Sequence, residues 1–167
     1  INGKSGEDLK ETSHTIIAKH IAFSYTSSST DTWDIWQQSV QDPDNNDNIR
    51  VVYTDRSQDE SYRDGCKCYS NFEKGTHADS WNREHVWPKS HGFPDEDDVA
   101  YTDVHNLKPC DRSVNSSRGT RDYDYGGNQH SEATECLYDS DSWEPSDSVK
   151  GDIARIIFYM VVRYDPG

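Results

Sequence analysis

Residues 81–90 read Trp-Asn-Arg-Glu-His-Val-Trp-Pro-Lys-Ser. The stretch sets a carboxylate, Glu84, directly beside an imidazole, His85, with a tryptophan on either side of the pair. Aromatic residues favour extended chain, and proline stops a strand because it has no N–H to donate. The stretch therefore predicts a short, rigid strand that ends near Pro88, and we expect the rest of the chain to hold it.

The pair at the centre of this strand raises a geometric question. Neighbouring residues on a regular strand point to opposite faces, so Glu84 and His85 address one target only where the strand bends or ends. We therefore predict an irregularity at this pair. Taken alone, a surface carboxylate and a packed histidine are the simpler interpretation.

Two polar stretches further along change that interpretation. Residues 103–109 read Asp-Val-His-Asn-Leu-Lys-Pro, and residues 111–119 read Asp-Arg-Ser-Val-Asn-Ser-Ser-Arg-Gly. If Asp111 or Ser113 caps a short helix, then Asp111, Asn115 and Arg118 share one of its faces. That helix would present an amide oxygen to a metal ion and a guanidinium to a phosphate.

These residue types suit one chemistry. A hard cation such as Mg²⁺ prefers oxygen ligands, and it commonly takes one or two protein groups, water and a substrate phosphate. Glu84 and Asn115 fit that requirement. A neutral His85 could take a proton from an attacking water. Together the residues predict hydrolysis of a phosphodiester.

Length and composition are consistent with one folded domain over residues 1–167. The chain is long enough for one core and too short for two comfortable domains. Only 31% of its residues are hydrophobic and its mean hydropathy is −1.07, but 10 tyrosines, 5 tryptophans and 4 phenylalanines offer large packing surfaces. No apolar run is long enough for a membrane span. Because the chain starts at Ile1 without a basic and apolar leader, we expect a processed or trimmed chain.

The net charge of −14 opposes a polyanionic substrate, which is normally met by a basic face. With this net charge, a basic face on this chain can cover only a small area. Cations do cluster in or beside the polar stretches, namely Arg83, Lys89, Lys108, Arg112, Arg118 and Arg121. We expect an acidic shell around a small basic cleft.

Four cysteines form an even set that allows three pairings. Cys66 and Cys68 are too close to bridge each other easily, so we expect each to bridge to Cys110 or Cys136. Such bridges would indicate an oxidising, extracytoplasmic setting. Four unpaired thiols remain the alternative.

The remaining segments supply the frame. Apolar spacing predicts a helix over residues 9–25 and core side chains at Trp33, Ile35 and Trp36. Residues 42–48 alternate oxygen side chains like a calcium loop, but the glycine and the closing glutamate of such a loop are missing, so a solvated turn is favoured. β-formers predict a strand over residues 49–54, and residues 55–80 predict a disulfide-pinned loop.

The C-terminal third predicts a turn-rich segment and then a helix. Between residues 120 and 146 we expect Tyr123, Tyr125 and Trp143 to act as anchors. After Ser146, apolar residues recur at helical spacing along one face, which predicts a core helix. They are Ile153, Ile156, Ile157, Met160, Val161 and Tyr164.

Four ordered motifs together resemble the bacterial endonuclease I family, the sugar-non-specific nucleases of the ββα-metal (His-Me finger) class. They lie at residues 82–90, 102–109, 114–119 and 150–160, and the likeness covers most of the chain. The resemblance implies an α+β fold, with a helical frame around a small hairpin-plus-helix site. It also implies a protein that is secreted or periplasmic.

The resemblance assigns roles residue by residue. His85 would be the general base, while Glu84 and Asn115 would hold one divalent ion, Mg²⁺ or else Mn²⁺ or Ca²⁺. The substrate would be DNA, and RNA as well, cut to 5′-phosphate products by a monomer that contacts the backbone and no membrane. Some members carry a phosphate-neutralising arginine between the first two motifs, but this chain has none there, so Arg118 and Arg155 are the candidates.

Two points complete the expectations: the role of His105 and Asn106, and the functions that compete with the nuclease. His105 and Asn106 are expected to brace the site and not to touch substrate. Two other functions compete with the nuclease: a metal-dependent phosphoesterase acting on small phosphates, and a non-catalytic, calcium-stabilised extracellular module. Cleavage of plasmid and RNA with and without a chelator separates the three.

Overall fold

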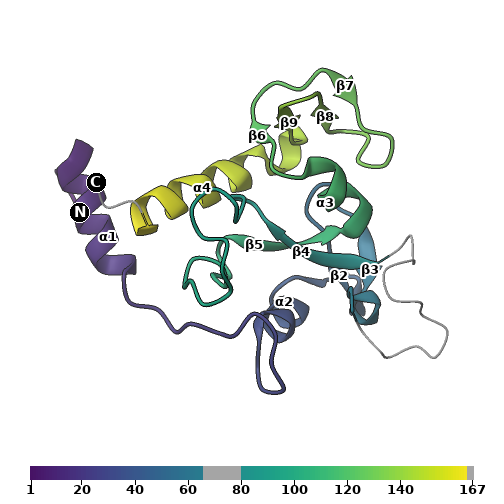
Figure 1. Ribbon diagram of the computed structural model, residues 1–167, viewed down its shortest axis with the longest axis horizontal. Coiled ribbons are helices and arrows are strands. Elements are labelled where there is room, and N and C mark those ends of the chain that lie inside the picture. Colours follow the sequence, from purple (N-terminus) through teal and green to yellow (C-terminus); the bar gives the residue numbers. More distant parts are fainter. Residues whose placement is uncertain (66–79, 165–167) are drawn as a thin grey trace.

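The computed structural model describes residues 1–65 and 80–164. An antiparallel hairpin of β4 (Trp81–His85) and β5 (Leu107–Asp111) lies at its centre (Figure 1). The two strands pair without a register shift, from Trp81 opposite Asp111 to His85 opposite Leu107. The prediction of an irregularity at residues 84 and 85 is therefore wrong for the pairing, which stays regular through both residues. The strand does end at His85.

Helix α3 (Arg112–Arg118) follows β5 directly and packs beside the hairpin (Figure 1). The expected helix is thus confirmed, with Asp111 at its N-cap position. The Asp111 side chain does not cap the helix, because its carboxylate is bound by Thr54 and Arg56 instead. Val114 faces inward and Arg118 is also buried.

The long helix α4 (Asp147–Tyr164) runs beside the hairpin and buries the predicted apolar stripe through Ile153, Ile156 and Met160. The first two join the largest core cluster, which also contains Val86, Cys110, Val114 and Trp143. This core fixes α3, the hairpin and α4 relative to one another. The predicted α+β class is confirmed.

Helix α1 (Gly6–Ile17) is shorter than the helix predicted over residues 9–25 and buries no residue. It lies beside the C-terminal end of α4 (Figure 1), where His14 Nδ1 contacts the Val162 carbonyl at 2.9 Å. Residues 18–25 leave the helix, and the chain then contacts the centre of the molecule through Tyr25. The spacing of apolar residues was too irregular to show that the helix ends at Ile17.

Helix α2 (Thr32–Ser39) begins with a capping box, in which Asp31 and Asp34 each accept the other's backbone N–H. Its Trp33 and Trp36 are buried, as predicted. Trp33 packs edge-on against Trp81 of β4, with ring centroids 5.0 Å apart. Ile35 is only partly buried.

The predicted turn at residues 42–48 forms a hairpin between β1 (Gln41–Asp42) and β2 (Asn45–Arg50). The strand expected over residues 49–54 therefore starts earlier and ends at Arg50, and the Val52 N–H then bonds the Pro109 carbonyl of β5. Strand β3 (Ser57–Asp59) and the short 3-10 helix η1 (Glu60–Tyr62) follow.

Between α3 and α4, four short strands form a small sheet in the order β6-β9-β8-β7. Their bounds are Asp122–Tyr123, Ser142–Glu144, Leu137–Tyr138 and Asn128–Gln129 in that order. Trp143 is fully buried and Tyr123 partly so, but Tyr125 is 85% exposed, so its predicted anchoring role is wrong. Backbone crowding requires glycine at residue 126, where a Cβ would lie 2.4 Å from the Leu137 carbonyl carbon.

The cysteine prediction fails for the two cysteines that are described. Cys110 and Cys136 are buried free thiols in the same core cluster. Cys66 and Cys68, like most of the predicted loop, lie outside the described residues. Among the described residues, apolar packing and not a disulfide bond stabilises the fold.

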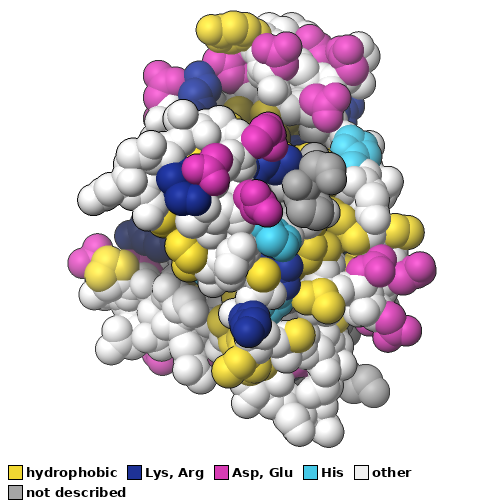
Figure 2. Space-filling model, turned by 90° about the vertical axis from the view of Figure 1, so that its left-hand side faces the viewer, with side chains coloured by type: hydrophobic (Ala, Val, Ile, Leu, Met, Phe, Trp, Pro, Cys, Tyr) yellow, Lys and Arg dark blue, Asp and Glu magenta, His cyan; other side chains and the backbone are white. Residues whose placement is uncertain are grey.

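The surface carries the acidic excess that the composition predicts. Figure 2 shows acidic side chains spread around one face, with a few cations nearer its middle among hydrophobic and histidine side chains. Among residues 1–65 and 80–164, no helix combines the length and apolar character needed to cross a membrane.

Candidate active site

Glu84 lies on the face of β4 that turns toward α3 and the core, where it is 2% exposed. Its Oε1 accepts a hydrogen bond from the Tyr53 hydroxyl at 2.8 Å and pairs with Arg118 Nη1 at 3.0 Å. Tyr53 has one proton and gives it to Glu84, so the contact of 2.6 Å with the Tyr123 hydroxyl requires Tyr123 to donate. The second carboxylate oxygen, Oε2, has no hydrogen-bond partner among the described residues.

Burial dominates the ionisation of this carboxyl. Desolvation raises the pKa of Glu84 from 4.5 to about 7, although Arg118 and the Tyr53 hydrogen bond act in the opposite direction. The group therefore exchanges its proton near neutral pH. A cation that could reach Oε2 would favour the carboxylate form.

His85 lies on the other face of β4, at the last residue of the strand. Its imidazole packs among three aromatic rings, stacking on Tyr25 at 5.9 Å and meeting Tyr101 edge-on at 4.7 Å, with Phe93 further away. Nε2 lies 2.9 Å from the Tyr101 carbonyl oxygen. A carbonyl only accepts hydrogen bonds, so Nε2 carries the proton and Nδ1 keeps its lone pair.

The imidazole is held in its neutral form. Burial lowers the pKa of His85 to about 4, and the positive charges of Lys89, Arg83 and Arg118 add to this, while the bond to Tyr101 partly opposes it. A neutral imidazole with a free Nδ1 is a competent proton acceptor across the ordinary pH range.

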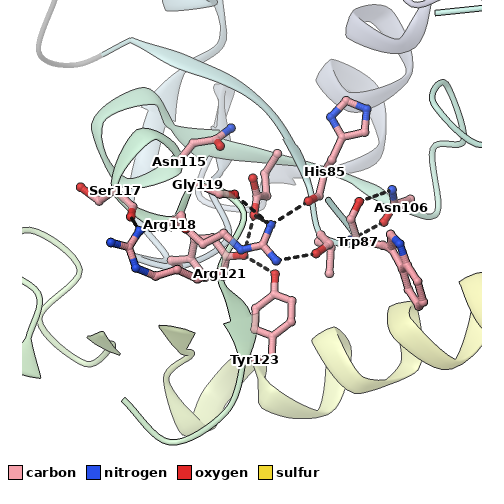
Figure 3. A network of polar contacts seen from close by, with 12 residues as sticks. His85, Trp87, Asn106, Asn115, Ser117, Arg118, Gly119, Arg121 and Tyr123 are labelled. Atoms are coloured by element: carbon pink, nitrogen blue, oxygen red, sulfur yellow. Dashed lines mark hydrogen bonds and ion pairs between the residues drawn. The ribbon is translucent and has the colours of Figure 1, made fainter. Parts of the chain in front are cut away.

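Asn115 lies on α3 and contacts the same strand face as Glu84. Its Nδ2 donates to the Asn82 side-chain oxygen at 2.7 Å, and Asn82 stands two residues before Glu84, which places the two on one face. The Asn115 amide oxygen has no partner within the described chain. In Figure 3 the Asn115 amide and the His85 ring both point away from Arg118 and Tyr123.

Arg118 is 1% exposed, and its guanidinium is already engaged within the protein (Figure 3). Besides Glu84 it donates to the carbonyls of His85 and Val86, at 3.0 Å and 2.8 Å. Arg118 thus links the end of β4 to Glu84, the candidate metal ligand. A direct role on a phosphate would require it to leave these partners.

The other cation candidates lie in different surroundings. Arg155 is an exposed residue of α4 that pairs with Asp152, and it lines a pocket that Glu84, His85 and Asn115 do not line. Lys89 is exposed near His85, and its Nζ contacts the Tyr101 hydroxyl at 2.7 Å. Sequence reasoning placed Lys89 in the cation cluster but assigned it no role.

The chain just after His85 is braced as expected. Asn106 is fully buried, and its side-chain amide bonds both the N–H and the carbonyl of Trp87, at 2.8 Å and 3.1 Å (Figure 3). His105 is exposed and packs against Tyr159. The contacts of Asn106 support its predicted bracing role. His105 makes no contact with the site residues.

Several residues of the site were missed in the sequence, and one of them is Tyr101, whose carbonyl bonds His85. Tyr53 binds Glu84, Tyr25 stacks on His85, and Asn82 binds Asn115. Only Asn82 carried a local signal, because the two-residue period of the strand puts it on the Glu84 face. Tyr53 and Tyr25 come from distant segments, and nothing in their neighbourhoods marks them.

The described residues contain no group of three or more histidine, cysteine, aspartate or glutamate side chains that could hold a metal ion. The candidate donors are instead one carboxylate oxygen and one amide oxygen, both without partners among the described residues. Two such hard ligands suit Mg²⁺, which keeps several waters. The donor set therefore fits the ion that the sequence predicts.

Comparison with known proteins gives two kinds of match. The sequence profile of the family described as Endonuclease I matches residues 5–166. An extracellular ribonuclease of Bacillus subtilis (strain 168) is 42% identical over 163 residues, which are 98% of this chain and 51% of that protein. An extracellular ribonuclease of Bacillus amyloliquefaciens is 42% identical over 166 residues, 99% of this chain and 52% of that protein. The chain thus spans about half the length of these curated relatives.

Proposed function

Because this chain belongs to the endonuclease I family, we propose that it is a divalent-metal-dependent endonuclease that hydrolyses DNA and RNA to 5′-phosphate products. Two relatives are named ribonucleases, which supports RNA as one substrate, and their names also support an extracellular location. Recognition would run through the phosphate backbone, so sequence preference should be weak.

The observation that carries the proposal is the state of His85. The Tyr101 carbonyl holds Nε2–H, three rings fix the plane of the imidazole, and burial keeps it neutral. Nδ1 is then the atom that takes the proton from the attacking water. The strand ends at this residue, and in the proposed mechanism the phosphate reaches both faces of β4 around that end.

Glu84 and Asn115 are the proposed ligands, through Oε2 and the amide oxygen. When bound there, a divalent ion would supply Lewis-acid stabilisation of the charge on the phosphate and on the leaving 3′-oxygen. Arg118 and Tyr53 hold Oε1 and so orient the carboxylate toward its ligand role. Asn82 fixes the Asn115 amide with its oxygen free.

Three cations could neutralise a substrate phosphate. Lys89 is the one we favour, because it is exposed and is held by the same Tyr101 whose carbonyl bonds His85. Arg118 would serve the reaction indirectly, by positioning Glu84 and the strand end. Arg155 would contact a phosphate at a distance from His85, as a part of the pocket it lines.

The test is cleavage of plasmid DNA and total RNA, with and without a chelator. We expect His85→Ala to lose about 10²–10⁴-fold or more in rate and to keep the fold and Mg²⁺ binding. Glu84→Ala should lose Mg²⁺ binding as well, as measured by calorimetry. His20→Ala is the matched control, since His20 is exposed and contacts Arg163, far along α4. Full activity in either site variant would refute the assignment.

A further inference from the structure

One pocket of the described residues lies apart from the candidate active site. It has a volume of about 470 Å³ and is bounded by α2, the end of β2, β5 and α4. A volume on the order of 300–1,000 Å³ is usual for small-molecule sites. None of Glu84, His85 and Asn115 lines it, so the proton transfer and metal binding proposed above take place outside this pocket.

One cation in the pocket has no anionic partner at contact distance. The Lys108 ammonium is half-buried and lies 4.5 Å from the centroid of the Trp36 ring, and no described residue offers it a hydrogen-bond acceptor. Arg155 lines the same pocket, with Asp152 as its ion-pair partner. Asp152 acts on this half-buried ammonium through its charge but makes no contact with it, and an anion in the pocket would offset more of the cost of burying the ammonium.

A second group in the pocket is also unsatisfied. Trp36 is 5% exposed, and its Nε1–H is buried without a hydrogen-bond partner. Buried donors are normally paired, so a ligand whose acceptor displaces the side chains that cover this N–H would satisfy it. The lining also includes Arg50, Asp55, Asp152 and His105. The rest of the lining is largely apolar, with Tyr159 and Ile156 on the α4 side. A ligand that fits must combine a flat apolar ring with a negative charge and acceptor oxygens.

We propose that this pocket binds a 5′-mononucleotide or a 5′-phosphorylated strand end. The phosphate lies between Lys108 and Arg155, the base lies against Trp36 and Tyr159, and an acceptor oxygen takes the Trp36 N–H. Aromatic stacking tolerates any base, so the site is not base-specific. The choice of a nucleotide rests on the proposed nuclease function, whose 5′-phosphate products are such ligands.

The probe is adenosine 5′-monophosphate, titrated into the full chain in the presence of EDTA so that no divalent ion contributes. Binding is followed by calorimetry and by the NMR signal of the Trp36 indole N–H. We expect that signal to shift on addition of the nucleotide. Adenosine and inorganic phosphate, the two halves of the ligand, should each bind at least about tenfold more weakly.

Lys108→Met keeps the length of the side chain and removes its charge, and we expect at least about tenfold weaker binding of the nucleotide. Trp36→Phe keeps the packing and removes the N–H, with a smaller loss of about threefold. Lys19→Met removes one charge from an exposed position outside the pocket and should bind like the parent. Parent-like affinity in Lys108→Met, or equal affinity for inorganic phosphate, overturns the proposal.

Plasmid cleavage in Mg²⁺, measured on the same samples, keeps the two hypotheses apart. An active nuclease that binds no mononucleotide leaves the proposed function standing and removes the pocket site. An inactive protein whose Trp36 signal responds to the nucleotide keeps the pocket site and removes the proposed nuclease function.

Discussion

Glu84 and His85 are adjacent in the sequence, yet they lie in opposite kinds of surroundings. Glu84 faces a network of hydrogen bonds and one buried guanidinium, whereas His85 faces three aromatic rings and one carbonyl. Burial is the main cause of both pKa shifts, raising the pKa of Glu84 to about 7 and lowering that of His85 to about 4. In both cases it favours the neutral form.

The difference shows how one strand end can serve two roles. The imidazole needs to be neutral to accept a proton, so for His85 burial alone produces the useful state. In the proposed mechanism the carboxyl must be charged to bind a cation, so burial of Glu84 opposes that proposed role, and Arg118 and Tyr53 partly compensate. We therefore expect stability and metal affinity to depend more on the Glu84 face, the proposed metal-ligand side of the strand, than on the His85 face.

The largest expected effect on stability comes from removing the buried cation. In Arg118→Met the Glu84 carboxylate loses its ion pair, and the carbonyls of His85 and Val86 lose their donors. Breaking a buried pair in this way costs about 3–5 kcal/mol. Urea unfolding at pH 8 in EDTA measures the loss.

The matched control is the double variant Glu84→Gln/Arg118→Met, which has no unpaired carboxylate. It should recover part of the stability, because the uncompensated charge is gone. A loss of less than about 1 kcal/mol in the single variant would show that the pair does not hold the strand end.

The next effect is a coupling between pH and metal. The pKa of Glu84 is raised in the folded, metal-free protein, so folding binds a proton between about pH 4.5 and pH 7. This group's contribution to stability is present at low pH and is lost as the pH rises through about 7. Mg²⁺ needs the carboxylate, so its affinity should increase about tenfold per pH unit below pH 7 and then level off. Calorimetry from pH 5 to pH 8 measures this.

His85 supplies the control for this coupling. Its pKa of about 4 keeps it neutral over the whole range, so His85→Asn should leave the pH dependence of Mg²⁺ binding unchanged. If that variant removes the dependence, or if the affinity is flat in the parent, the contrast between the two faces fails.

The sequence was a good guide to this site where the signal is local, and a poor one where it depends on distant partners. The strand at Glu84 and His85, the helix with Asn115 and the core stripe of α4 follow from periodicity and proline. The burial of Arg118 against two carbonyls could not be predicted, because exposed and buried arginines look alike in a helix of seven residues. The end of α1 and the strand at residues 49–54 were misplaced because weak apolar patterns leave element boundaries undetermined.

The smallest expected effect concerns the hydroxyl that holds Glu84. Tyr53→Phe removes the hydrogen bond to Oε1, and with it a donor that stabilises the charged form, so the pKa of Glu84 should rise further. We expect a loss of about 1 kcal/mol in stability at pH 8, and Mg²⁺ binding should level off at a higher pH than in the parent.

Tyr123→Phe separates that bond from its neighbour. Tyr123 donates to the Tyr53 oxygen and not to Glu84, so this variant removes one hydroxyl from the same network and leaves the carboxylate bond intact. The pH at which Mg²⁺ binding levels off should therefore stay near that of the parent. Equal shifts in the two variants would mean that the network as a whole, and not the Tyr53 bond, sets the ionisation of Glu84.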